Sequence, residues 1–288
     1  MKRLIVNADD FGVTRGVNRG IIRCFREGIV RSTTIMANGD AFNGAVELAR
    51  ANPGLGIGVH VVLVGGRALA PRKEIGRLAG DNGELPRTVR SLVLKMSARM
   101  IRSNEIEAEV RAQIERVRAA GITPTHVDTH KHAHLHPIVM KAIARVASEY
   151  GIKRVRMPFE DFFATLGSFR SNGQKMLRRK AFAMGARAAY PSFRRIAEKN
   201  RMRTPEHFFG FAATGQLACE GLLRIIRNLP DGTSELVCHP GINDAELERT
   251  GTRLKAEREV EVTALTDAGV KKEIVERGVH LMSFRELN

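Results

Sequence analysis

No apolar run in this chain approaches the ~20 residues that a membrane-spanning helix needs. Cysteine is scarce as well: Cys24, Cys219 and Cys238 lack zinc-ribbon spacing, and their odd number argues against a disulfide framework. The N-terminus leads into a strand-like run of only three or four residues, too short for a secretion signal. We therefore expect a cytoplasmic protein.

Acidic side chains are few relative to basic ones, since 47 Lys and Arg stand against 31 Asp and Glu, a net charge of +16. That balance favours attraction to polyanions, either nucleic acid or an anionic membrane surface. In the stretch 175–203, Glu198 is the one acid among ten basic residues: Lys175, Arg178, Arg179, Lys180, Arg187, Arg194, Arg195, Lys199, Arg201 and Arg203. This stretch is either a solvated helical face or a basic amphipathic element that lies on anionic lipid.

Short β-rich runs alternate with helix-like segments along most of the chain. The predicted strands span 4–8, 32–37, 57–63, 126–129, 154–157, 235–238 and 279–282. The predicted helices span 16–27, 41–51, 105–120, 137–150, 217–228 and 254–266. Such alternation is typical of parallel strands joined by crossover helices, in a barrel or in a doubly wound sheet.

Polar residues at the ends of the predicted strands favour the barrel. They are Asp9, Asp10, His60, His130, Arg156 and His239. In a (β/α) barrel, these strand ends gather at the mouth where active sites form. A doubly wound sheet commonly carries a Gly-rich phosphate loop, and the sequence has neither a dinucleotide motif nor a Walker motif. We predict an α/β fold: an irregular, TIM-like (β/α) barrel of about seven mainly parallel strands, in a single domain spanning 1–288.

Two stretches interrupt the alternation. Residues 64–90 contain Gly, Pro and Asn at turn-forming positions and are predicted to form a long loop over the mouth. Residues 160–215 are predicted to form a basic helical insertion between two strands. Within it, the aromatic cluster of 204–211 could border a binding groove.

Paired carboxylates and clustered histidines carry the predicted chemistry. The segment 7–12 (N-A-D-D-F-G) contains Asp9 and Asp10, which repel each other unless a cation or a shared proton intervenes. The segment 126–136 supplies imidazoles from His126, His130, His132, His134 and His136. In extended backbone, His130, His132 and His134 would share one face, because residues two apart point the same way. The pattern indicates a metal-dependent hydrolase, with one true ligand in the histidine segment.

A metal site needs ligands from more than one strand. His60 is a lone histidine in an apolar run, which in isolation is more often a core residue. With Asp10 and His130, however, it completes a carboxylate-and-two-imidazole set whose free positions hold water and substrate. Asp9 is then free to take a proton from that water. Zinc suits this set of ligands, and magnesium, manganese or cobalt would also be accepted.

The remaining candidates would transfer protons or contact substrate. His239, in C-H-P-G, is either a turn-capping residue or a general acid that protonates the leaving group. Arg156 either orients the aspartate pair or the substrate, or is a structural ion-pair partner. His132 and His134 either position substrate or hold their neighbours, and His207 is a further candidate for substrate contact.

These motifs resemble those of the YdjC-like carbohydrate deacetylases, whose pattern is an N-A-D-D-F-G start, a G-x-H strand, a D-S-H-x-H-x-H centre and a C-H-P segment. They stand here in the same order at 7–12, 58–60, 128–134 and 238–240, with Thr129 in place of the serine. The resemblance implies a distorted barrel and removal of the N-acetyl group from an amino sugar such as N-acetylglucosamine. It also implies that Asp10, His60 and His130 hold the metal and that Asp9 is the catalytic base.

The basic insertion and the segment 204–211 further resemble the hopanoid-biosynthesis branch of that family. This resemblance implies an N-acetylglucosaminyl glycolipid substrate and peripheral contact with anionic lipid at the inner face of the membrane.

Two other classes of protein function stay open. A metal-dependent phosphoesterase would use the same ligands on an anionic substrate, and a non-enzymatic nucleic-acid-binding protein is suggested by charge alone. We expect no nucleic-acid partner, because the sequence has no recognised nucleic-acid module.

Overall fold

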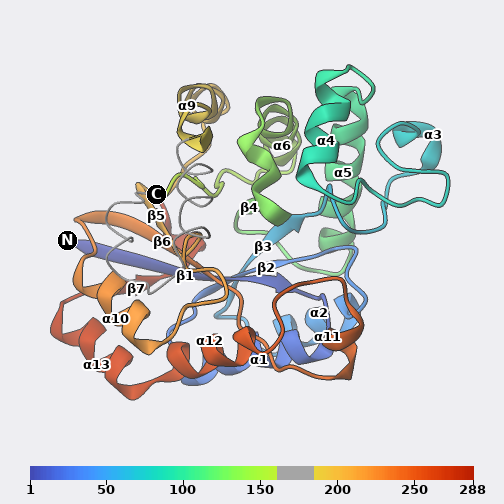
Figure 1. Ribbon diagram of the computed structural model, residues 1–288. Coiled ribbons are helices and arrows are strands. Elements are labelled where there is room, and N and C mark those ends of the chain that lie inside the picture. The colour runs from blue at the N-terminus through green and yellow to red at the C-terminus, as the bar shows by residue number, and fades with distance from the viewer. Residues whose placement is uncertain (161–184) are drawn as a thin grey trace.

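The computed structural model describes residues 1–160 and 185–288, and at its centre is a curled sheet of parallel strands (Figure 1). The described residues form seven strands: β1 (Lys2–Phe11), β2 (Ser32–Ile35), β3 (Gly56–Val61), β4 (Val127–Thr129), β5 (His207–Phe209), β6 (Gly232–Cys238) and β7 (His280–Met282). Their order is β4-β3-β2-β1-β6-β5, and β7 pairs with the first half of β1. The α/β class and the parallel strands are confirmed, in the form of a partial barrel.

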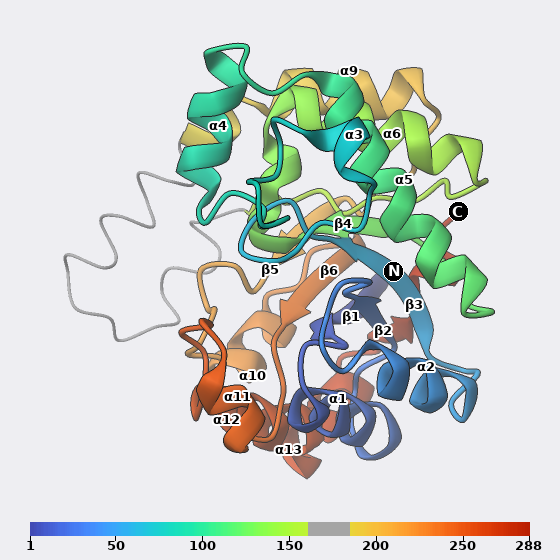
Figure 2. The ribbon, with the colours of Figure 1, turned by 90° about the vertical axis from the view of Figure 1, so that its right-hand side faces the viewer.

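Helices cover the sheet in two groups (Figures 1 and 2). The group below the sheet in Figure 1 is α1 (Arg15–Glu27), α2 (Phe42–Arg50), α10 (Cys219–Arg227), α11 (Ala245–Arg249), α12 (Glu257–Thr266) and α13 (Ala268–Glu276). The group above it is α3 (Arg72–Ile75), α4 (Val89–Ser97), α5 (Ser103–Ala119), α6 (Pro137–Glu149) and α9 (Tyr190–Lys199). None of the helices in the described ranges is long and apolar enough to cross a membrane.

Capping side chains set several helix starts. Thr14 accepts a hydrogen bond from a first-turn N–H of α1, and Asp244 and Asp267 do the same for α11 and α13. Close packing then fixes α1 against the sheet. A Cβ on Gly20 would lie 2.5 Å from the Cα of Gly241, so only glycine lets α1 approach the turn after β6 this closely.

The C-terminal segment fills part of the space inside the curled sheet. Side chains alternate along β1, so Ile5 points to the same side of the sheet as Asp9. Ile5 packs with Met282, Phe284 and Leu287 in a small cluster separate from the main core. The Phe284 ring stacks on the imidazole of His126 with centroids 3.8 Å apart. His126 is therefore a core residue.

The barrel is interrupted between β4 and β5. Residues 154–157, predicted as a strand, make only isolated bridges, from Val155 to Val127 and from Arg154 to Arg203. The prediction of a regular strand there is wrong. Conversely, β5 was not predicted, because a strand of three residues is too short to show an alternating pattern.

Two stretches were predicted to interrupt the alternation, 64–90 and 160–215. The first differs from the prediction, and the second is only partly described. Residues 64–90 are not simply a loop, because they contain α3 and lead into α4, and α3 packs against α5. Of the predicted basic insertion, residues 161–184 lie outside the described residues, and 185–215 include α9 and β5. The single-domain assignment stays a prediction.

Candidate metal centre and acid–base site

The parallel register brings the functional residues to one end of the sheet. Ala8 of β1 lies opposite Cys238 of β6, and His60 of β3 lies opposite Asp128 of β4. The residues that follow these positions therefore reach the same end. In Figure 1, β1 runs toward the right-hand side of the picture. Figure 2 shows the protein from that side, so this end of the sheet faces the reader.

Asp10, His60 and His130 form the core of this site. The Nε2 of His60 lies 3.6 Å from the Oδ1 of Asp10, and the Nδ1 of His130 lies 3.5 Å from the same oxygen. Ligand atoms about 2.1 Å from a tetrahedral ion are separated by about 3.4 Å. The three atoms are therefore spaced as ligands of one small cation would be.

The Asp10 carboxylate fits such a cation. Its Oδ1 is buried and has no hydrogen-bond partner among the described residues, while its Oδ2 accepts a bond of 2.6 Å from Arg258. Burial alone would raise the pKa of Asp10, but the Arg258 guanidinium and the His130 imidazole hold it well below the usual range. Asp10 also has φ +71°, a left-handed conformation that costs energy outside glycine and often marks functional sites. An ionised, buried oxygen that accepts no hydrogen bond is well suited to a cation.

A second set of close ligand atoms, from Asp9, His60 and Asp128, is less suitable for a metal. Arg156 donates hydrogen bonds to both oxygens of Asp9, at 2.7 and 2.8 Å, and lies 2.6 Å from Asp128. Both carboxylates thus already share the positive charge of the Arg156 guanidinium. The described residues therefore contain one His/Asp cluster whose free oxygen could hold a metal ion, through Asp10, His60 and His130.

Asp128 orients His60 from behind. Its Oδ1 lies 2.7 Å from the Nδ1 of His60, and the Thr34 hydroxyl lies 3.1 Å from the same nitrogen. With Nδ1 bonded to Asp128, Nε2 faces Asp10, which is the carboxylate–histidine arrangement common behind metal ligands. Burial lowers the pKa of His60, but the Asp128 and Asp9 carboxylates outweigh it and raise this pKa to about 9. The site therefore favours positive charge at His60, which a divalent ion can supply in place of a proton.

The Asp9 carboxylate lies beside this cluster, and hydrogen bonds fix its orientation. In addition to Arg156, it accepts hydrogen bonds from the Asn7 amide at 3.0 Å and the Thr34 hydroxyl at 3.2 Å. Burial opposes ionisation, but the charge of Arg156 keeps the pKa of Asp9 well below its usual range. Asp9 is thus an ionised carboxylate in a fixed orientation, and its Oδ2 lies 4.0 Å from the Nε2 of His239.

Arg156 is the centre of the buried charge network. It is fully buried, and its Nε donates a hydrogen bond of 2.7 Å to Glu235 in addition to its contacts with Asp9 and Asp128. Burial raises the pKa of Glu235 to about 7, even though Arg156 acts in the opposite direction. Arg156 thus orients Asp9 of the predicted aspartate pair, whereas Asp10 is held by Arg258, and the same contacts also fit the predicted role of a structural ion-pair partner.

His239 directly follows β6, and its imidazole lies beside the Asp–His cluster. Its backbone N–H donates to Glu261 of α12, and the Arg258 side chain of the same helix reaches its carbonyl. Burial lowers the pKa of His239 to about 4, so the imidazole is neutral at physiological pH. A neutral imidazole can donate a proton only as it receives one, and Asp9 lies on its Nε2 side.

The histidine segment is not extended, so the expectation that His130, His132 and His134 share one face is wrong. It forms a 3₁₀ segment, His130–Leu135, in which Lys131 and His132 have left-handed φ of 54° and 51°. Only His130 reaches Asp10. His134 is fully buried against the Thr129 hydroxyl and the Arg156 carbonyl, and His132 packs edge-on to Phe208 and Phe211. His134 thus holds its neighbours in place, and His132 lies against the Phe208 and Phe211 rings.

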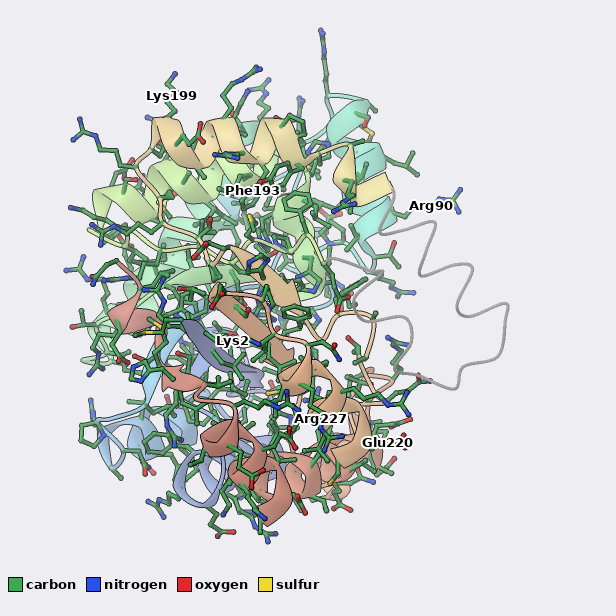
Figure 3. The ribbon with its side chains drawn as sticks, turned by 90° about the vertical axis from the view of Figure 1, so that its left-hand side faces the viewer. Lys2, Arg90, Phe193, Lys199, Glu220 and Arg227 are labelled. Atoms are coloured by element: carbon green, nitrogen blue, oxygen red, sulfur yellow. The ribbon has the colours of Figure 1, made fainter. Side chains whose placement is uncertain are left out.

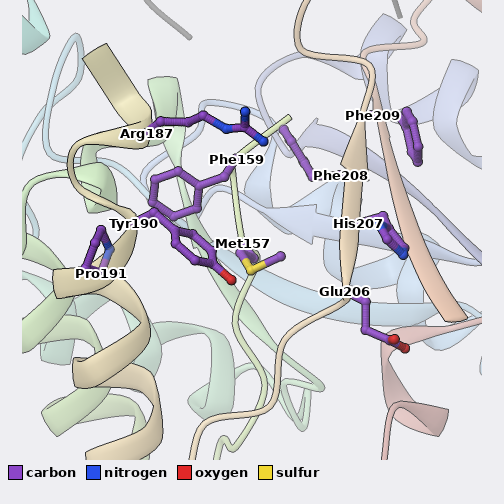
Figure 4. Close-up of a pocket in the computed structure, with 9 residues that line it drawn as sticks. All are labelled: Met157, Phe159, Arg187, Tyr190, Pro191, Glu206, His207, Phe208 and Phe209. Carbon is purple, nitrogen blue, oxygen red and sulfur yellow. The ribbon is translucent and has the colours of Figure 1, made fainter. Parts of the chain in front are cut away.

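His207 lies away from the Asp–His cluster. On β5 it pairs with Ser234, near the start of β6, and its Nε2 lies 3.2 Å from the Asp231 carbonyl. It lines a separate pocket of about 410 Å³ whose walls combine aromatic side chains with the charged side chains of Arg187 and Glu206 (Figure 4). One wall of that pocket is Phe208, and the Arg156 guanidinium carbon lies 5.8 Å from the centre of its ring.

Several residues of the site had no role assigned from the sequence. Asp128 stands inside the histidine motif, and Glu235 is a charged residue in a predicted apolar strand. The sequence could therefore have indicated a functional role for both. Arg258 lies in a predicted helix that contains other charged residues, and nothing in the sequence sets it apart. Its partner Asp10 is 248 positions away, and only folding brings the two together.

A parallel partial barrel with an Asp–His cluster at its strand ends defines an α/β protein of the TIM-like type. The family model described as YdjC-like protein matches residues 3–276, and the chain belongs to this family. A carbohydrate deacetylase of Geobacillus stearothermophilus is 35% identical over 283 residues, which cover 98% of this chain and 96% of that protein. A carbohydrate deacetylase of Brevibacillus brevis is 32% identical, with 99% of each chain covered.

Solved structures agree with this assignment. An Enterococcus faecalis protein, provisionally named a cellobiose-phosphate cleavage protein, superimposes with a TM-score of 0.78 and 26% identity. The match covers 99% of this chain and 98% of that one. A Thermus thermophilus lactam utilization protein matches with a TM-score of 0.50 at 16% identity, which shows a shared fold alone.

Proposed function

We propose that this protein is a metal-dependent N-deacetylase that hydrolyses the acetamide group of an N-acetylglucosamine-type amino sugar and releases acetate. The observation that carries the proposal is the buried Asp10 oxygen, which accepts no hydrogen bond and faces His60 and His130, with the oriented carboxylate of Asp9 beside it. The carbohydrate deacetylases of Geobacillus and Brevibacillus, which align over almost the whole chain, support the substrate class.

Asp10, His60 and His130 would hold a divalent ion, which supplies Lewis acidity toward the amide carbonyl and lowers the pKa of water. Arg156 keeps Asp9 ionised, so Asp9 can accept the proton of the attacking water. His239, neutral and 4.0 Å from Asp9, would receive a proton and deliver it to the departing sugar nitrogen. General acid–base catalysis of this kind contributes typically about 10²–10⁴-fold to the rate.

We extend the proposal to a glycolipid substrate of the hopanoid type, with contact between the protein and anionic membrane. The resemblance of 204–211 to the hopanoid-biosynthesis branch supports it, as does the net charge of +16. A phosphoesterase would use the same ligand set, so the choice between the two reactions is left to experiment.

The test is acetate release by protein loaded in turn with zinc, magnesium, manganese or cobalt. The substrates are N-acetylglucosaminyl hopanoid, N-acetylated chitobiose and, in parallel, a phosphate monoester. We expect acetate release, and we expect Asp9→Asn to retain bound metal while losing at least about 100-fold in rate. Asp231→Asn is the matched control, because this exposed aspartate pairs with the N-terminal amine.

Release of phosphate without acetate would overturn the proposed reaction. Full deacetylase activity in a metal-loaded Asp9→Asn variant would remove the role given to Asp9. Turnover of the soluble sugar alone would keep the chemistry and reject the hopanoid substrate.

A further inference from the structure

One segment outside the site combines unpaired positive charge with exposed apolar side chains. Residues 85–104 contain no acidic residue, and the basic residues among them are Arg87, Arg90, Lys95, Arg99 and Arg102. Among the described residues, no carboxylate forms an ion pair with Arg87, Arg90, Lys95 or Arg99. The charge of this segment is therefore not compensated by any carboxylate of residues 1–160 and 185–288.

The same segment exposes two large apolar side chains. Leu94 is 59% exposed and Met100 is 54% exposed, whereas Leu92, Met96 and Ile101 are buried. The buried side chains anchor the segment to the body of the protein, so the exposed pair belongs to an ordered outer face. Arg90 is one helical turn before Leu94 and projects away from the body (Figure 3).

We propose that residues 87–102, which comprise α4 and the turn after it, form a surface that binds an anionic lipid bilayer; we call it the α4 surface. Guanidinium and ammonium groups would pair with lipid phosphates, while Leu94 and Met100 enter the boundary of the acyl chains. Charge complementarity points to a polyanion. The aliphatic pair selects the bilayer over nucleic acid, because aliphatic side chains give bases no ring on which to stack.

Hydrogen bonds hold the first part of the segment that joins His60, a proposed metal ligand, to the α4 surface. Just after β3, the Gln113 side chain of α5 bonds both the N–H and the C=O of Val62, at 2.8 and 2.7 Å. Glu109, also on α5, accepts hydrogen bonds from the N–H groups of Leu69 and Ala70. These bonds fix the start of the segment that leads from β3 to α4.

Binding through the α4 surface would therefore set the orientation of the protein on the bilayer. In Figure 2, α4 lies on the same side of the sheet as α3 and α5, beyond the end of β3. This orientation would present the site to a glycolipid in the membrane, and that use of it rests on the proposed function. The binding itself does not depend on it.

The test is co-sedimentation of the full chain with phosphatidylcholine vesicles that contain or lack phosphatidylglycerol. We expect binding only to the vesicles with phosphatidylglycerol, weakened by added salt. Two double variants, Arg90→Glu with Arg99→Glu and Leu94→Ser with Met100→Ser, should each lower the partition coefficient by about tenfold or more.

The chain offers matched controls on the opposite group of helices. Val260 and Val275 are 47% and 78% exposed on α12 and α13, and Val260→Ser with Val275→Ser should leave vesicle binding unchanged. Lys271→Glu with Lys272→Glu is the corresponding charge control. All of the substituted residues lie on the outside of helices or in a turn, and a thermal melt verifies that each variant is folded.

Unchanged vesicle binding by both α4 variants would overturn the inference. So would binding of a duplex oligonucleotide by the unchanged protein with no retention on vesicles. Acetate release from a soluble acetylated sugar is measured in parallel and should be unaffected by the α4 variants. Vesicle binding that is lost in these variants, with no acetate released by any form, would refute the proposed function and leave the α4 surface established.

Discussion

Replacement of Asp128 by asparagine tests whether the buried charge network supports a metal site. The asparagine keeps the size of the side chain and an oxygen that can accept from the Nδ1 of His60. It removes the negative charge behind that histidine and one of the carboxylates around Arg156. Loss of such a supporting carboxylate typically weakens metal affinity by about 10–100-fold, which corresponds to about 1.4–2.7 kcal/mol.

The pH of the measurement matters, because two effects of the substitution oppose each other. Buried His60 has a pKa raised to about 9 by Asp128 and Asp9, so below that pH a proton competes with the metal. Asp128→Asn lowers this pKa and so reduces the competition, which partly masks the loss of support. At a pH well above 9 the competition is small in both proteins, and nearly the full loss of affinity should be visible.

The assay is titration of the metal-free protein with buffered zinc in competition with a chromophoric chelator. Glu109→Gln is the control, because it also removes a buried carboxylate but one that bonds the backbone of Leu69 and Ala70. We expect a weaker zinc affinity in Asp128→Asn and an unchanged affinity in Glu109→Gln. Equal affinities in Asp128→Asn and the unchanged protein at a pH well above 9 would refute the role assigned to Asp128.

Three further outcomes follow from the structure. Glu235→Ala removes the acceptor of the hydrogen bond from the buried Arg156 Nε. Urea unfolding should then show a free energy of unfolding lower by about 1–3 kcal/mol, and an unchanged value would contradict that contact. Hydrogen bonds from Arg227 and then Arg277 lower the pKa of Glu273 to about 2, so its contribution to stability is present above pH 4.5 and is lost as the pH falls toward 2. Glu273→Gln should flatten the pH dependence of Tm in that window, and equal slopes for both proteins would reject this linkage. Removal of metal by a chelator should lower Tm, because zinc at 100 times its Kd adds about 2.7 kcal/mol, and an unaltered Tm would show that no metal binds the folded state at that concentration.

The sequence was sufficient to predict the class of fold and the location of the site. The strands near 4–8, 32–37, 57–63, 126–129, 235–238 and 279–282 were predicted, because short β-rich runs alternate there with helix-like segments. Parallel strands place their carboxyl ends together, so Asp10 and His60 could be expected to meet before any coordinates were known. The local pattern carries this information because burial of apolar strands dominates the choice of fold.

Local sequence pattern failed where the backbone conformation is set by distant contacts. The segment His130–Leu135 has the spacing of an extended strand, yet Lys131 and His132 adopt left-handed φ. His134 is held there by the Thr129 hydroxyl and the Arg156 carbonyl, the second of which comes from a separate part of the chain. The cost of two left-handed residues is repaid only by that tertiary packing.

The sequence by itself thus determined a parallel α/β protein with carboxylates and imidazoles gathered at its strand ends. Only the tertiary structure decided which of them pair, because Arg156 with Glu235 and Arg258 with Asp10 are joined across 79 and 248 positions. It also decided that α4 exposes Leu94 beside unpaired cations, since the exposed face of a helix depends on what packs against the opposite one. Pairing and exposure are properties of the packed chain, and no local pattern of residues contains them.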